Sequence, residues 1–140
     1  VTRNSGVLKT YINGQQNSSD TLTTSFTPST SSSTVIGGFD GSSTWPRWDG
    51  LIDDVAIFNS ALDQTAVSAL YGAAPNAGIP SEVTGAIGYW RMGDDSSDSP
   101  VDAGLISGIT DSSGNGNDAT TVASSQPTFS ALASSETIYS

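Results

Sequence analysis

The chain has 140 residues, enough for a domain with a hydrophobic core, and fourteen acidic against four basic residues give a net charge of −10. This charge argues against nucleic acid or an anionic membrane as a partner, because no basic patch is available to neutralise phosphates. The sequence has no Cys and no His, which excludes disulfides, thiolate chemistry, histidine catalysis and histidine metal ligation. No apolar run approaches the roughly 20 residues of a membrane span, so membrane insertion is not expected.

The first part of the chain predicts short strands joined by turns. Residues 1–13 read as two strands around a turn at residues 4–6. The pair Asn13-Gly14 follows, and Asn-Gly is a strong signal for a tight hairpin turn because both residues tolerate positive φ. Residues 21–27 and 34–38 then predict two further short strands, the first ended by a proline and the second containing two glycines.

A long loop over residues 39–49 holds the candidate ligand-binding side chains Trp45, Arg47 and Trp48. Exposed aromatic rings beside an arginine can stack on a sugar ring. The alternative is that the cluster packs over the end of the domain and has a purely structural role.

Residues 49–58 predict a strand that starts at an Asp-Gly turn and carries one acid on each face, Asp53 and Asp54. A carboxylate on a half-buried strand costs free energy unless something pairs with it. We therefore expect Asp53 to have a partner, either a metal ion, a backbone donor or one of the few cations.

A short helix is predicted from Asp63 to Tyr71, with Asp63 as the N-cap and Gly72 as the stop signal. The following segment is rich in Pro, Ala and Gly, which is typical of a linker. We place a domain boundary at residues 75–85, between a first part, 1–74, and a second part, 86–140.

The second part opens with a predicted strand over residues 86–92, in which Trp90 is expected to belong to the core. An acidic loop, 94–105, and a glycine- and asparagine-rich loop, 111–118, come next. The second loop needs positive φ at several positions. A short strand at 119–122 and a polar tail that can add an edge strand complete the predicted elements.

Oxygen-bearing side chains make calcium the expected metal. Calcium prefers carboxylate and amide oxygens, and Asp111, Asn115 and Asp118 supply them within one loop. The spacing is not that of an EF-hand, because the loop lacks the twelve-residue frame and the final Glu. The alternative is that these residues cap turns through their own backbone.

Several motifs together resemble a known family. The order Tyr11-Ile12-Asn13-Gly14, Ile36-Gly37-Gly38, residues 48–58, Ala61-Leu62 and Leu70-Tyr71 resembles the second half of a laminin G-like domain, a member of the concanavalin A-like lectin and glucanase superfamily. Residues 88–94 followed by 111–120 resemble the opening of another such domain.

The resemblance implies an all-β fold, an antiparallel jelly-roll sandwich with one short helix, and by analogy it makes Asp53 and Asp111 calcium ligands. The halves stand in reverse order, which predicts an incomplete or permuted sandwich. One explanation is a tandem repeat in a larger chain, which the sequence favours. The other is that the halves complement each other, within the chain or between copies, by strand addition.

The predicted function is a non-catalytic, adhesive carbohydrate-binding module of a larger extracellular or surface-displayed assembly. An enzyme is not expected, because glycoside hydrolysis needs two carboxyls at about 5–9 Å and adjacent strand residues such as Asp53 and Asp54 point apart. The only glutamates, Glu82 and Glu136, do not form a glucanase motif.

Two other functions stay open. The resemblance also extends to structural proteins of tailed-phage virions, where the module would be architectural and its partners neighbouring subunits rather than glycans. The other open function is that of a polysaccharide-degrading enzyme whose catalytic domain lies outside this segment. The expected location is accordingly extracellular, at the cell surface or in a virion, in a larger chain or a homo-oligomeric assembly.

Overall fold

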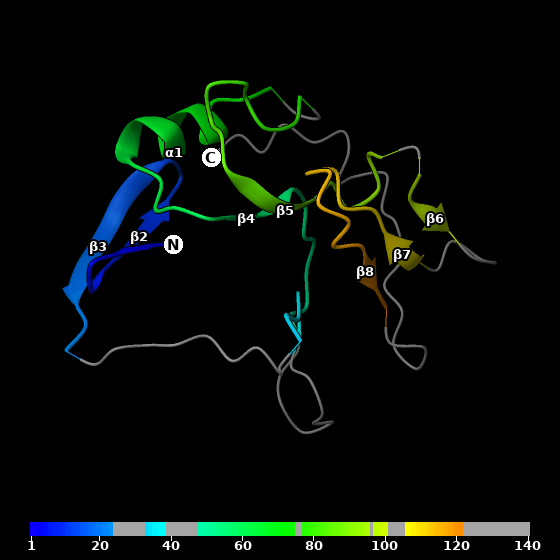
Figure 1. Ribbon diagram of the computed structural model, residues 1–140, viewed down its shortest axis with the longest axis horizontal. Coiled ribbons are helices and arrows are strands. Elements are labelled where there is room, and N and C mark those ends of the chain that lie inside the picture. Colours follow the sequence, from blue (N-terminus) through cyan, green and yellow to red (C-terminus); the bar gives the residue numbers. More distant parts are fainter. Residues whose placement is uncertain (24–32, 39–47, 75–76, 96, 101–105, 122–140) are drawn as a thin grey trace.

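The computed structural model describes residues 1–23, 33–38, 48–74, 77–95, 97–100 and 106–121. Over these residues the chain forms mostly antiparallel strands and a single short helix (Figure 1), which confirms the predicted all-β class. The elements are β1 (Thr2–Asn4), β2 (Val7–Ile12), β3 (Gln15–Thr21), β4 (Val55–Phe58), α1 (Gln64–Tyr71), β5 (Ala86–Trp90), β6 (Ser99–Pro100), β7 (Ile106–Ile109) and β8 (Ala119–Thr120).

The first sheet has strand order β1-β2-β3. Its third strand ends at Thr21, so the strand predicted over residues 21–27 is wrong at residues 22 and 23, and residues 24–27 lie outside the described residues. Its first turn uses Ser5 and Gly6 at φ 47° and 82°, and its second uses Asn13 and Gly14 at φ 50° and 73°. Both turns therefore place two consecutive residues in the left-handed region that a two-residue hairpin requires. The turn at Asn13-Gly14 is confirmed, and the strand that follows it is β3.

Helix α1 is fixed at its start by the predicted N-cap. The Asp63 carboxylate accepts a hydrogen bond from the backbone N–H of Ala66 at 2.8 Å. The expected stop is present but differs in geometry, because Gly72 has φ −83° and stays in the right-handed region. Gln64 Nε2 donates to the Gly14 carbonyl at 2.6 Å, which joins the helix to the second hairpin turn (Figure 1).

Two further predicted strands are wrong in part or in whole. The strand predicted over residues 49–58 begins only at Val55, because Asp54 has φ 47° and interrupts the extended backbone. Residues 34–38 form no strand and bend at Gly37, which has φ 74°. The Gly37 carbonyl nevertheless accepts a backbone hydrogen bond from Trp48 at 2.9 Å, so two distant segments are joined there.

The core is built around β5. Strand β5 pairs antiparallel with β4, with Val55 opposite Trp90, and this pairing joins segments on the two sides of the predicted linker. Trp90 is 7% exposed and clusters with Ile106 and Ile109 of β7, as expected of a core residue. Ile36, Val55, Met92 and Ala119 pack against this cluster. The division into two domains stays a prediction.

Gly88 lies under the Trp90 ring, and this close approach gives a testable prediction. A Cβ at position 88 would lie 2.5 Å from Trp90 Cη2 and 3.0 Å from Cζ2, so the buried indole would have to move. We expect Gly88→Ala to lower the free energy of unfolding by about 1–3 kcal/mol in urea denaturation.

The matched control for this substitution is Gly108→Ala on β7. A Cβ there would lie 3.5 Å from the Ala119 carbonyl oxygen, an ordinary contact, so this variant should change stability little. Equal losses in the free energy of unfolding for Gly88→Ala and Gly108→Ala would show that contact with Trp90 does not cause the destabilisation.

Candidate functional site

The loop at residues 111–118, here called the Asp111 loop, covers the edge of β5 that faces away from β4. Asp111 Oδ1 accepts from the Tyr89 N–H at 2.9 Å, and the Ser112 N–H donates to the Tyr89 carbonyl at 2.8 Å. Asn117 Nδ2 donates to the Ile87 carbonyl at 2.7 Å. The loop therefore pairs with this edge of β5 in place of a strand, and an edge covered in this way is protected from pairing with other chains.

The Asp111 carboxylate is the centre of the loop. It is 5% exposed, and besides Tyr89 it accepts from the backbone N–H groups of Ser113 and Asn117, each at 2.9 Å. Desolvation favours a higher pKa, but hydrogen bonds from the Ser113 side chain and the three backbone donors outweigh it and lower the pKa of Asp111 to about 2. The charged carboxylate is thus a hydrogen-bond acceptor for groups of the fold itself.

The other two predicted metal ligands of this loop also have internal roles. Asp118 Oδ1 accepts from the Asp111 N–H at 2.8 Å, and Asn115 Nδ2 donates to Ser113 Oγ at 3.0 Å. Among the residues that the structure describes, no group of three or more acidic side chains is arranged to hold a metal ion. These hydrogen bonds are the ones expected of side chains that cap turns. Calcium binding by this loop stays a prediction.

Asp53 lies apart from this loop, and its carboxylate accepts from the Asp54 N–H at 3.0 Å. The structure therefore supplies a backbone donor as one partner of Asp53. Partial burial, followed by the charges of Asp54 and Asp94, raises the pKa of Asp53. In a neighbouring contact that no sequence pattern indicates, the Tyr89 hydroxyl donates to Asp54 Oδ1 at 2.6 Å.

Trp48 is the one predicted ligand-binding residue that the structure places, since Trp45 and Arg47 lie outside the described residues. Its side chain is 65% exposed, yet the indole Nε1 donates to the Leu51 carbonyl at 3.0 Å. A Cβ at Gly50 would lie 3.0 Å from the same nitrogen, so the ring rests closely on the glycine backbone. The result is an exposed indole held in one orientation.

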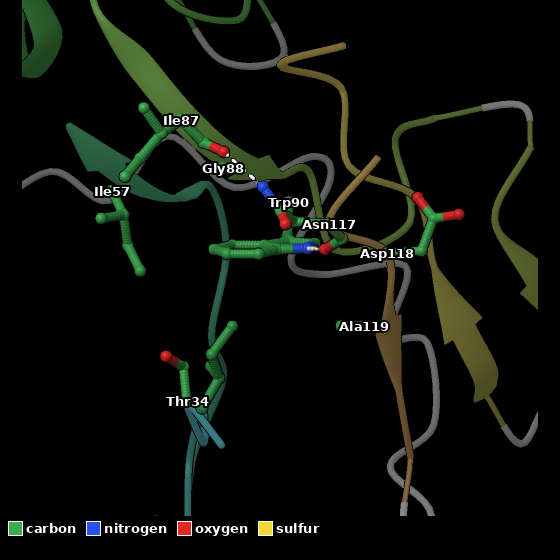
Figure 2. A pocket seen from close by; sticks show the side chains of 9 residues that line it. Thr34, Ile57, Ile87, Gly88, Trp90, Asn117, Asp118 and Ala119 are labelled. Carbon is green, nitrogen blue, oxygen red and sulfur yellow. Dashed lines mark hydrogen bonds between the residues drawn. The ribbon is translucent and has the colours of Figure 1, made fainter. Parts of the chain in front are cut away.

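A cavity of about 380 Å³ lies beside the Trp90 indole (Figure 2). Ile57, Ile87 and Trp90 give it an apolar wall, and Thr34, Asn117 and Asp118 add polar groups. The indole Nε1 donates to the Asn117 carbonyl at 2.9 Å, so the Asp111 loop also fixes the orientation of this ring. The sequence analysis missed the cavity, because its residues come from four separate segments.

A larger hollow of about 1060 Å³ lies where the first sheet, α1 and β4 meet. Tyr11 and Gly14 line it from the first sheet, Leu70 from the helix, and Asp54 with Tyr89 from the region of β4 and β5. The first sheet and the β4–β5 pair are therefore separated by open space over part of their length.

Residues 1–68 match the family model of the concanavalin A-like lectin/glucanases superfamily, which confirms the resemblance for this segment. No curated protein and no solved structure shows significant similarity to the chain. Laminin G-like domains are generally non-catalytic and typically extracellular, and members of this superfamily serve as carbohydrate-binding or structural modules. None of the helices formed by the described residues is long and apolar enough to cross a membrane.

The role of Asp111 predicts a stability defect on amide substitution. In Asp111→Asn one of the two acceptor oxygens becomes an NH2 group, so at least one buried backbone N–H loses its partner. We expect a loss of about 1–3 kcal/mol in the free energy of unfolding by urea titration. Asp20→Asn is the control, because Asp20 is exposed and, among the described residues, its carboxylate accepts a single long hydrogen bond, 3.4 Å, from Ser18. A similar loss in the control would contradict the assignment.

The lowered pKa of Asp111 also predicts a pH dependence. The pKa is about 2 in the folded protein and roughly 3.9 in an unfolded chain. The carboxylate therefore stabilises the fold fully above the unfolded value, and this stabilisation is lost as the pH falls from about 4 to about 2. The stability difference between wild type and Asp111→Asn should shrink over this range in urea titrations at stepped pH. A difference independent of pH would refute the prediction.

Proposed function

We propose that the chain is a non-catalytic, adhesive module that binds carbohydrate within a larger extracellular or surface-displayed assembly. The match of residues 1–68 to a lectin and glucanase superfamily supports this function class. The observation that carries the proposal is the exposed, fixed indole of Trp48.

An indole suits a sugar because one face of a pyranose ring presents C–H groups while its hydroxyls point outward. The aromatic face covers the C–H face, and water or polar neighbours satisfy the hydroxyls. Fixing the ring in advance lowers the cost of binding, because little side-chain freedom is lost when the ligand arrives. The hydrogen bond to Leu51 and the contact with Gly50 provide this restraint.

The charge of the chain limits the class of glycan. A net charge of −10 and the neighbouring exposed Asp49 disfavour sulfated sugars and uronic acids. We therefore expect neutral glycans to bind at Trp48. The long-range part of this selectivity should weaken at high ionic strength, because salt screens exposed charges.

Catalysis is not part of the proposal. The adjacent acids Asp53 and Asp54 accept hydrogen bonds from a backbone N–H and from Tyr89, respectively. Glu82 and Glu136 are the only glutamates and do not form the glucanase arrangement. A glycan bound at Trp48 should accordingly be recovered uncleaved.

The Trp48 site is tested by substitution and glycan titration. Trp48→Ala should weaken binding of a neutral glycan identified on an array by about tenfold or more, because the stacking face is removed. Trp48→Phe should retain part of the affinity. Ile12→Ala removes an apolar side chain of β2 that is 59% exposed and should change affinity little. Unchanged binding by folded Trp48→Ala would reject this site.

An architectural module is the second candidate, and one observation favours it. Ile57 and Ile87 are 37% and 42% exposed at the cavity beside Trp90, and such apolar side chains suit contact with a neighbouring subunit. This function would gain support if the chain bound no glycan and sedimented as an oligomer with these two residues in the interface.

A further inference from the structure

The chain contains two Asn-Gly pairs in different surroundings, Asn13-Gly14 and Asn115-Gly116. Such a pair can react with itself when the backbone nitrogen of the glycine attacks Cγ of the asparagine. The N–Cγ bond forms, the Cγ–Nδ2 bond breaks, and the side-chain nitrogen leaves as ammonia. Water then opens the cyclic imide to aspartate or isoaspartate. Glycine favours the attack, because it has no Cβ to block the approach and its backbone is the most flexible.

The surroundings of Asn115 leave this reaction unhindered. Asn115 is exposed, and apart from each glycine and its two neighbours in the chain, no described heavy atom lies within 4 Å of the Cβ position of either Gly114 or Gly116. Among the hydrogen bonds of the described residues, none uses the Gly116 N–H, so this nitrogen is not held away from the side chain. Among the described residues, the side-chain amide of Asn115 donates to Ser113 Oγ at 3.0 Å and, in a long contact, to the Ala86 carbonyl at 3.4 Å.

The surroundings of Asn13 hinder the same reaction at Asn13-Gly14. The turn is closed by β2 and β3, with Ile12 paired to Gln15 on either side. Gly14 is buried, its carbonyl accepts from Gln64 at 2.6 Å, and its Cβ position lies 2.9 Å from the Tyr71 ring. Ring closure at Asn13 would have to rotate a backbone that the sheet and the helix hold in place.

We propose that Asn115 is a site of spontaneous deamidation in the folded protein, whereas Asn13 is protected. The product also has a consequence for the fold. A carboxylate at position 115 cannot donate to Ser113 or Ala86, and it adds negative charge to a loop that already contains Asp111 and Asp118. The Asp111 loop is therefore loosened over the start of β5. The inference does not rest on the proposed glycan site.

The rates at the two sites can be measured in one sample. The full chain is incubated at physiological temperature and slightly alkaline pH, and peptides are followed by mass spectrometry over time. We expect conversion at Asn115 to be several-fold faster than at Asn13 in the folded protein, and the two rates to become similar in concentrated urea. Equal rates in the folded protein, or faster conversion at Asn13, would overturn the proposal.

Two variants test separately the deamidation of Asn115 and the loosening of the Asp111 loop. Asn115→Gln keeps the amide donors but requires a larger ring, so the acidic shift of the folded chain in isoelectric focusing should slow markedly. An unchanged shift would place the reaction elsewhere and overturn the proposal. Asn115→Asp should speed hydrogen exchange of the Ser113 and Asn117 amides relative to wild type. Unchanged exchange would refute the loosening of the loop.

Discussion

The hydrogen bonds that converge on the Asp111 carboxylate are the constraint on which the described structure depends. They hold the Asp111 loop against the outer edge of β5, while β4 occupies the inner edge. With both edges engaged, β5 presents Trp90 to the core, and the loop returns to hold the indole through the Asn117 carbonyl. One buried charge thereby joins its own loop to a backbone group that lies 22 residues away in the chain.

Two other acidic side chains nearby also accept hydrogen bonds from within the fold. Asp98 is 8% exposed, and its two oxygens accept from the Gly93 N–H at 2.8 Å and the Thr110 N–H at 2.7 Å. Asp95 accepts from the Ser97 N–H and from Ser112 Oγ. In a chain with only four basic residues, backbone N–H groups take the place of cations as partners of the charge. An acidic composition therefore indicates internal acceptors here as much as a preference for bound cations.

The features that the sequence predicted correctly are local. The turn at Asn13-Gly14 and the N-cap at Asp63 depend on residues a few positions apart, and their chemistry is visible in the sequence. The strand over residues 49–58 was placed too early, because its apolar pattern continues through Asp54 while the backbone does not.

The hydrogen bond that Asp111 accepts from Tyr89 joins residues 22 positions apart, and no local pattern in the sequence indicates it. The orientation of Trp48 likewise depends on Gly50 and Leu51 acting on the same ring. The tryptophan is visible in the sequence, but the contacts that restrain its ring are not.

Trp48 is also coupled to the core, although it lies at the surface. Its backbone N–H donates to Gly37, and Ile36 beside that glycine packs against the cluster of Trp90, Ile106 and Ile109. The Asn117 carbonyl of the Asp111 loop accepts a hydrogen bond from Nε1 of the same Trp90 indole. The acid that holds the loop and the candidate ligand platform are therefore different residues, Asp111 and Trp48, and the described contacts connect them through the Trp90 cluster and Ile36.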